Sequence, residues 1–413
     1  MRIVRNYTAS QETRNCALML LVLFPFFPLI AIIALLLVNV TTPKIDKVVL
    51  SSLFICLALY LGLINATKEP TSDQWFYMQA YNEVPKVGFV RSLTNIYGTY
   101  FDRIHIVNVK EMGFGLVNYI GYYMTFGNYP LFVCLFTTVL YVILFYCIYL
   151  FFVGKMDAKT KILSGVFSIA FFTQFFNLTI HLQRQQIAIV VMMLALVMYV
   201  RKGRRNWFLI FSACLLHTSV ILFVPFFLLG DLIRKASNRI LILGMCMIAV
   251  VFISINSFGI FISNIIGDSY ITSRMIHAGS SEENRMSIGL VLLLAVPMST
   301  FSLYRLFFYK RESLRSEKVM YIIYISIIIL VFTIPDNTLQ YRYFMLSYVF
   351  IPFVFPQLFS TIKYSDLNIY LNIIIPCFLV LRFFFTFEDI SFKYAPIENV
   401  LFSNAITLLF FRS

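Results

Sequence analysis

The stretch Ile180-His181-Leu182-Gln183-Arg184-Gln185-Gln186-Ile187-Ala188 introduces an apolar run, 189–200, that ends at four clustered basic residues. A run of this length and composition predicts a membrane helix, and Arg184 then lies about one turn inside its start. A charged side chain at that depth costs a few kcal/mol, so such residues usually face an interior cavity and carry function. At helical spacing His181, Arg184, Gln185 and Ala188 share one face, which predicts a binding site for an anionic ligand.

The composition indicates a polytopic membrane protein rather than a soluble domain. Of the 413 residues, 60% are hydrophobic and 13% are charged, and the mean hydropathy is +0.84. The net charge of +14 is concentrated in short loops, where positive residues set membrane topology. The lipid bilayer is therefore the expected partner, and nucleic acid is not. The seven cysteines form no C-x-x-C pair, so the sequence predicts neither a metal site nor a cofactor.

Apolar runs of suitable length predict an all-α fold with about eleven or twelve transmembrane or re-entrant helices. The first expected span is 16–40. Placing the basic loops in the cytoplasm puts Arg184 and Arg342 near the outer surface, together with the loop 258–285. The arginines before residue 15 compete with Lys44 and Lys47 for the inner side, so the topology of residues 1–127 stays open.

The segment 206–230 is expected to be irregular. Basic residues flank it on both sides, which requires an even number of membrane passes. A re-entrant pair of half-helices that breaks near His217 satisfies this requirement, and a kinked single span is the alternative. A lone histidine in an apolar run is usually a core residue. The break and the adjacent hydroxyl residues instead favour a histidine that lines a cavity.

The loop 66–112 contains a possible sugar-binding helix. Asp73, Tyr77 and Tyr81 recur every four residues and so share one face. A carboxylate accepts hydrogen bonds from sugar hydroxyls, and an aromatic ring packs on the C–H face of a sugar. An interfacial amphipathic helix with an aromatic belt would show the same pattern.

A second guanidinium is expected beside Arg184. Arg342 lies between two tyrosines at the same depth and on the same side, and two arginines suit bidentate phosphate recognition. A single arginine reaching for the interface is the alternative explanation of Arg184. The other candidate binding residues are His181, Gln185, Tyr343, Arg274 and Arg285.

These motifs follow one another in a definite order. They are Asp73-x-x-x-Tyr77-x-x-x-Tyr81, Glu111-x-Gly113-Phe114, Arg184-Gln185-x-x-Ala188, Leu216-His217-Thr218-Ser219 and Tyr341-Arg342-Tyr343-Phe344. Their order and spacing resemble the EpsG-like branch of the bacterial Wzy family of polysaccharide (O-antigen) polymerases.

The resemblance implies a GT-C-like glycosyltransferase of the bacterial inner membrane that needs no metal. It also places the loop 66–112 at the periplasmic face. The enzyme would move a growing glycan from one undecaprenyl diphosphate onto a second lipid-linked repeat unit at the periplasmic face. A separate membrane protein that regulates chain length would be a partner in some pathways. Arg184 and Arg342 would stabilise the diphosphate leaving group. A histidine titrates near neutral pH and Asp73 is better placed to meet sugar, so His217 and Asp73 both remain candidates for the base.

Two other functions stay open. A flippase or other transporter of lipid-linked glycan would have a similar number of spans and a cationic cavity, but should show pseudo-symmetric halves. An O-antigen ligase would use the same donor with lipid A as the acceptor.

Overall fold

The computed structural model of the chain describes residues 11–71, 73–94, 112–247, 249–250, 289, 291–308, 317–333, 337–360, 365–388 and 394–410. Every regular element in these ranges is a helix, which confirms the all-α class expected from the sequence. The helices form two compact units. Unit 1 holds Met1–Leu194, Trp207–Val220 and Ile369–Ser413, and unit 2 holds Ala195–Asn206 and Ile221–Asn368.

Among the described residues, four helical stretches are long and apolar enough to cross a membrane: α3 (Lys47–Ala66), α6 (Tyr129–Phe152), α9 (Gln183–Lys202) and Gln340–Phe359. A bent pair, α7 (Ala158–Ala170) and α8 (Thr173–His181), makes a fifth if it crosses as one span. The other apolar helices are 10–17 residues long. The chain is therefore a polytopic membrane protein, with fewer full-length spans in the described residues than the sequence predicts.

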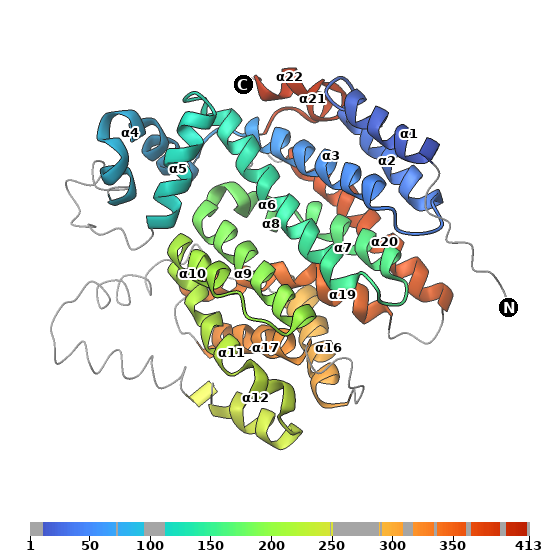
Figure 1. Ribbon diagram of the computed structural model, residues 1–413, viewed down its shortest axis with the longest axis vertical. Coiled ribbons are helices and arrows are strands. Elements are labelled where there is room, and N and C mark those ends of the chain that lie inside the picture. The colour runs from blue at the N-terminus through green and yellow to red at the C-terminus, as the bar shows by residue number, and fades with distance from the viewer. Residues whose placement is uncertain are drawn as a thin grey trace. The chain divides into compact units, whose positions relative to one another are not determined.

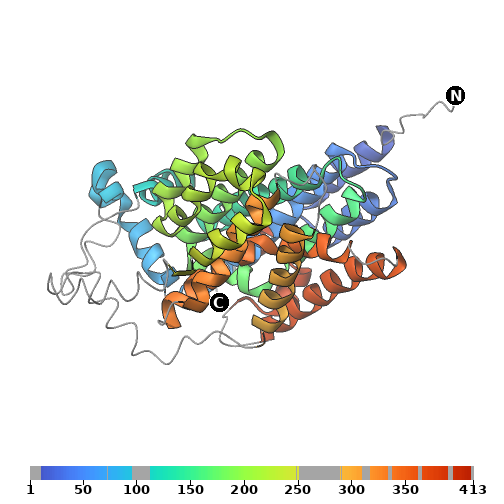
Figure 2. The same ribbon diagram turned by 90° about the horizontal axis from the view of Figure 1, so that it is seen from below.

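The apolar run 16–40 departs from the prediction that it forms one span. It contains two helices, α1 (Gln11–Leu23) and α2 (Pro28–Thr41), which pack against each other and against α3 (blue in Figures 1 and 2). Pro28 begins α2, and proline has no N–H with which to continue a preceding helix. Each helix is about 20 Å long at 1.5 Å per residue, which is too short to cover the bilayer core.

The turn between α1 and α2 returns the chain to the end of unit 1 at which α1 starts. Arg14 of α1 donates to Asp46, the N-cap of α3, across 2.9 Å. Lys159 at the start of α7 donates to the carbonyl oxygens of Val40 (3.0 Å) and Thr42. The starts of α1, α3 and α7 and the end of α2 therefore lie together. We call this the basic end of unit 1.

The opposite end of unit 1 gathers the end of α3, the start of α6 and the junction of α8 and α9. Gly62 of α3 lies so close to α6 that a Cβ would be 2.5 Å from the carbonyl oxygen of Cys134, so the end of α3 packs on the start of α6. Asn65 donates to Thr179 of α8 across 2.8 Å. We call this the polar end, because the polar side chains described below are found there.

Two helices follow α3 at the polar end. α4 (Asp73–Thr94) and α5 (Met112–Met124) pack side by side (Figure 1). α4 bends at Gly88, whose φ of 71° is the left-handed conformation that glycine tolerates best. α5 in turn packs on α10 (Trp207–Leu216). α5 therefore contacts both α4 and α10.

The C-terminal part of unit 1 covers α3. It consists of α20 (Ser365–Phe385), η6 (Thr386–Glu388), α21 (Ile397–Phe402) and α22 (Ala405–Leu409), and α22 packs on α3 (red and blue in Figure 1). The hydroxyl of Tyr60 in α3 donates to the carbonyl oxygen of Val400 across 2.9 Å. The backbone N–H of Ala405 donates to Pro25, between α1 and α2, across 2.9 Å. These contacts tie the last described helices to the first.

Unit 2 is built from short helices and one buried ionic cluster. Its elements are η1 (Thr218–Phe223, shared with unit 1), α11 (Val224–Leu228), α12 (Gly230–Lys235), Asn238–Met247, η3 (Val291–Ala295), α16 (Val296–Phe307), α17 (Lys318–Thr333), α18 (Asn337–Leu346), η5 (Tyr348–Phe350) and α19 (Ile351–Phe359). Arg305 of α16 bonds to Gln357 across 2.8 Å and lies 3.5 Å from the carboxylate of Glu317. This cluster joins α16, α17 and α19.

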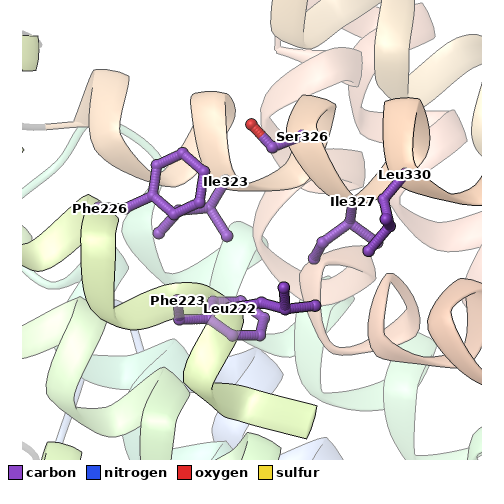
Figure 3. A pocket seen from close by; sticks show the side chains of 7 residues that line it. All are labelled: Leu222, Phe223, Phe226, Ile323, Ser326, Ile327 and Leu330. Carbon is purple, nitrogen blue, oxygen red and sulfur yellow. The ribbon is translucent and has the colours of Figure 1, made fainter. Parts of the chain in front are cut away.

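A small hollow in unit 2 lies between α17 and the η1–α11 segment (Figure 3). Its lining is apolar except for the hydroxyl of Ser326. The residues that line it are Leu222, Phe223, Phe226, Ile323, Ser326, Ile327 and Leu330. The lining contains no charged side chain and none of the site residues predicted from the sequence.

Candidate functional site

Arg184 lies in the first turn of α9, as the sequence predicts, but the helix is interrupted just before it. α8 ends at His181, and Leu182 has a φ of −124° and a ψ of 49°, which is not helical. His181 and Arg184 therefore belong to different helices, and the single face expected to carry both is broken. Gln185 is buried, whereas Arg184 is only half-buried.

The Arg184 guanidinium is held by Tyr77 of α4. Its Nε donates to the tyrosine hydroxyl across 3.4 Å, and the centre of the guanidinium lies 5.6 Å from the ring centroid. The ring of Tyr77 packs edge-on against Phe114 of α5, with 5.5 Å between centroids. Two residues that the sequence predicted for one site, Arg184 and Tyr77, are thus in contact.

The aromatic face of α4 points into the protein rather than outward. Tyr77 is 2% exposed and Tyr81 is fully buried. The Tyr81 hydroxyl bonds to Thr125, and its ring packs on Phe132 with 4.9 Å between centroids. Asp73, on the same helix, is half-buried. Direct stacking of a sugar on Tyr77 or Tyr81 is therefore disfavoured, because both rings are covered by other side chains.

A buried hydrogen-bond chain beside Arg184 was not anticipated from the sequence. Gln183 Nε2 donates to the Tyr129 hydroxyl across 3.4 Å, and that hydroxyl donates to the carbonyl oxygen of Gln74 across 3.3 Å. This chain joins α9, α6 and α4. The side-chain oxygens of Gln74, Gln183, Gln186 and Asn118 are buried and have no hydrogen-bond partner among the described residues.

The three glutamines had a signal in the sequence. Gln183 and Gln186 flank Arg184, and Gln74 follows Asp73, so each is a polar residue at the start of a helix. Burial of an amide without a partner costs about 1–3 kcal/mol. Such groups are expected where a polar ligand or water completes the hydrogen bonding.

His217 lies at a break in the chain, as the sequence predicts. Its backbone N–H bonds to Ala213, which closes α10, and η1 begins at the next residue. Its ring Nδ1 accepts a hydrogen bond from the Ser219 N–H across 3.0 Å. The neutral ring then carries its proton on Nε2. The half-buried imidazole is therefore oriented by its own turn.

α5 brings the His217 break and the Arg184–Tyr77 pair into one assembly. Gly113 approaches the backbone of Leu215, where a Cβ would lie only 2.9 Å from the carbonyl oxygen. The next residue, Phe114, packs on Tyr77. Adjacent residues of α5 thus contact the end of α10 and the tyrosine that holds Arg184. The helical periodicity of the sequence does not predict that α5 contacts both of these segments.

The other predicted residues are in unit 2 or outside the described residues. Arg342 is exposed and Tyr343 half-buried on α18 of unit 2, so the partnership of Arg342 with Arg184 stays a prediction. Arg274 and Arg285, with the loop 258–285 that contains them, lie outside the described residues.

Comparison with known proteins agrees with this set of motifs. The EpsG family model matches residues 93–399, which is more than half of the chain. The chain belongs to the EpsG family. The proteins of this family are membrane proteins related to the Wzy-like polysaccharide polymerases. No curated protein and no solved structure matches the chain.

The EpsG match includes Arg184, His217 and Arg342 but begins after the helical turns that carry Asp73, Tyr77 and Tyr81. The resemblance inferred from the motifs is thereby confirmed for the family, while the α4 residues stand outside the matched range. Their place in the site rests on the contacts of Tyr77 with Arg184 and Phe114.

Proposed function

We propose that this EpsG-family protein is a glycosyltransferase that polymerises surface polysaccharide. It joins oligosaccharide repeat units carried on undecaprenyl diphosphate at the periplasmic face of the bacterial inner membrane. The observation that carries the proposal is the Arg184 guanidinium, which lies at a helix start and is held by Tyr77. A helix start already attracts anions through its free N–H groups and the helix dipole.

The distribution of charge in unit 1 supports the orientation. The basic end carries Arg14, Lys47 and Lys159 beside connections between helices. Positive residues in short loops favour the cytoplasmic side, which directs the polar end with Arg184 outward. Because α1 and α2 return the chain to one end, Arg14 and Lys47 lie at the same end and both favour it as the inner side.

The proposed reaction transfers the growing glycan to a sugar hydroxyl. The hydroxyl oxygen of the acceptor forms a bond to the anomeric carbon, and the bond from that carbon to the donor diphosphate breaks. Arg184, with Arg342 as its proposed partner, stabilises the charge that develops on the leaving diphosphate. The guanidinium groups thereby supply the positive charge that a metal ion supplies in other transferases, and His217 or Asp73 takes the proton of the hydroxyl.

The burial of Tyr77 and Tyr81 changes the roles that we propose for them. Tyr77 positions Arg184, and Tyr81 packs α4 against α5 and α6. Asp73 remains the proposed contact for sugar on α4. A membrane protein that regulates chain length remains a proposed partner.

The decisive experiment replaces Arg184 in the bacterium that makes the protein. We expect Arg184→Ala to leave lipid A capped with a single repeat unit, at normal protein level. Arg184→Lys should restore chain length only in part, because an ammonium cannot bind phosphate in a bidentate fashion. The matched control is Arg201→Ala, near the other end of the same helix, which should retain long chains.

The outcome also separates the rival functions. Loss of a flippase or of an O-antigen ligase leaves lipid A with no cap, whereas loss of a polymerase leaves a cap of one unit. Long chains in the Arg184→Ala strain would reject the role of Arg184, and absence of any cap would reject the polymerase.

A further inference from the structure

The turn that follows α9 is tied to α12 by an ionic cluster around Asp231, and all of this cluster lies in unit 2. The hydroxyl of Tyr199 donates to one carboxylate oxygen of Asp231 across 3.0 Å, and the guanidinium of Arg205 donates to the other across 2.5 Å. Arg205 Nε also donates to the carbonyl oxygen of Phe227, across 2.6 Å. Arg234 lies 3.7 Å from the same carboxylate. The end of α9 is therefore held against α11 and α12.

Tyr199 is the side chain on which these two stretches of chain meet. It is 1% exposed. A Cβ at Gly230 would lie 2.8 Å from carbon atoms of the tyrosine ring, so the start of α12 approaches the ring as closely as a glycine allows. The guanidinium carbons of Arg205 and Arg234 lie 5.7 and 5.9 Å from the ring centroid, which is within the range of cation–π attraction. The two stretches thus converge on one buried ring.

This convergence concentrates positive charge. Asp231 is the only acidic residue between positions 199 and 241 of the sequence, and its carboxylate already accepts the bonds from Tyr199 and Arg205. Four further cations in the same two stretches have exposed side chains, and they are Lys202, Arg204, Lys235 and Arg239. Cations that gather on one surface repel one another, and a bound anion relieves that repulsion.

The backbone contacts place the cations of the two stretches beside each other. Gly203 lies between Lys202 and Arg204, and a Cβ there would be 3.5 Å from a terminal nitrogen of Arg234. Lys235 follows Arg234 directly. The turn after α9 and the end of α12 therefore form one basic surface, which we call the basic turn.

Exposed leucines border the basic turn. Leu228, Leu229 and Leu232 are 59%, 52% and 60% exposed, and they surround Asp231 in the sequence. Membrane topology depends on the number of positive residues in each short loop, so it does not require two loops to converge beside leucines. A phosphate that carries acyl chains complements both the charge and the apolar surface.

We propose that Lys202, Arg204, Lys235 and Arg239 bind the phosphate headgroup of an anionic phospholipid, whose acyl chains pack on the leucines of α11 and α12. The Asp231 cluster holds the two stretches together so that one headgroup can reach both. Positive residues in short loops favour the cytoplasmic side, where anionic phospholipids give the leaflet its negative surface potential. The site is at the end of α9 opposite to Arg184 and does not depend on the proposed enzymatic function.

The test measures lipid preference through the fluorescence of Trp207. The chain has two tryptophans, and Trp207 follows Arg205 by two residues and is 49% exposed. The full-length Trp75→Phe protein, in phosphatidylcholine nanodiscs, retains Trp207 as its one tryptophan. Brominated phosphatidylglycerol should quench this fluorescence at a mole fraction about fivefold or more below that required of brominated phosphatidylcholine.

Removal of the cations should remove this preference. Arg204→Gln and Lys235→Gln should each reduce the preference for phosphatidylglycerol by about threefold to fivefold, because each basic residue near the bilayer surface adds attraction to anionic lipid. The variant with all four cations replaced by glutamine should be quenched equally by the two lipids. The matched control is Lys44→Gln, which removes an exposed cation of unit 1 and should leave the preference unchanged.

Three results would overturn the proposal. The first is equal quenching by the two lipids when all four cations are present. The second is an equal loss of preference in Lys44→Gln, which would show that net charge alone attracts the lipid. The third is displacement of the lipid by inorganic phosphate at constant ionic strength, which would identify a soluble phosphate compound as the ligand. The single substitutions keep the test decisive if the fourfold variant does not fold, because each changes one exposed side chain.

Discussion

The close contact between α5 and α10 can be tested with a single methyl group at Gly113. A Cβ there would lie 2.9 Å from the carbonyl carbon and oxygen of Leu215 and 3.0 Å from the N atom of Leu216. These are backbone atoms, which cannot rotate away as a side chain can. α5 must therefore move until the contacts reach the ordinary range that begins at 3.4 Å.

The sign of the change in stability on Gly113→Ala shows whether the steric contact or the higher helix propensity of alanine has the larger effect. Alanine favours a helix over glycine by about 1 kcal/mol, whereas overpacking costs about 1–3 kcal/mol. Gly113→Ala should therefore lower the free energy of unfolding by about 1 kcal/mol. Gly244, in the helix Asn238–Met247, is the matched control, because a Cβ there meets no atom within 4 Å. Gly244→Ala should be neutral or stabilising.

The same substitution should reduce activity, because α5 also carries Phe114 against Tyr77, which holds Arg184. We expect shorter glycans in cells with Gly113→Ala, and long glycans with Gly244→Ala. The measurements are the midpoint of thermal unfolding in detergent micelles and the length distribution of the surface polysaccharide. A Gly113→Ala protein that melts no lower than the wild type, and makes chains of wild-type length, would refute the proposed role of this contact.

Two further substitutions test the polar end and the basic end. Tyr129→Phe removes the hydroxyl that joins Gln183 to Gln74 and should cost about 1–3 kcal/mol in unfolding free energy, because buried polar groups lose their partner; an unchanged melting midpoint would contradict this. Burial raises the pKa of the Asp46 carboxyl, but hydrogen bonds from Arg14 and from the first N–H groups of α3 bring it below the usual 3.8. The stability that the Asp46 carboxylate gives the folded protein is therefore complete above pH 3.8. It is lost as the pH falls through the lower pKa of the folded state. Asp46→Asn should lower the free energy of unfolding at pH 7 by roughly 0.5–1 kcal/mol, as for a partly exposed ion pair, and so lower the melting midpoint slightly. This difference should vanish at acid pH. A difference that is independent of pH would refute the ion pair.

Features that depend on short stretches of chain could be read from the sequence. Apolar composition predicts a helical membrane protein because every backbone polar group must bond internally in lipid. The break at His217 follows from the length of an apolar segment between two basic flanks. The position of Arg184 at a helix start follows from the apolar run after it.

Features that depend on neighbours distant in the sequence could not be read in this way. Four-residue spacing places Tyr77 and Tyr81 on one face, but it does not say whether that face meets water or α5. The run 16–40 has the composition of a span, and Pro28 marks a break within it, but only the packing of α1 and α2 on α3 shows that the chain turns back there. Lys68 has no motif around it, and only the fold places it beside the ring of Tyr394 near the other end of the chain.

The sequence by itself thus determined the helical membrane class, the family motifs and the chemistry of the individual groups, because composition and local spacing control hydrophobicity and helix periodicity. Only the tertiary structure decided which groups meet. Tyr77 contacts Arg184 and α5 reaches the His217 break through Gly113 because close packing of helices brings distant residues together. The physical reason is that side-chain burial and hydrogen bonding are satisfied across the whole fold, and no single stretch of the chain contains that information.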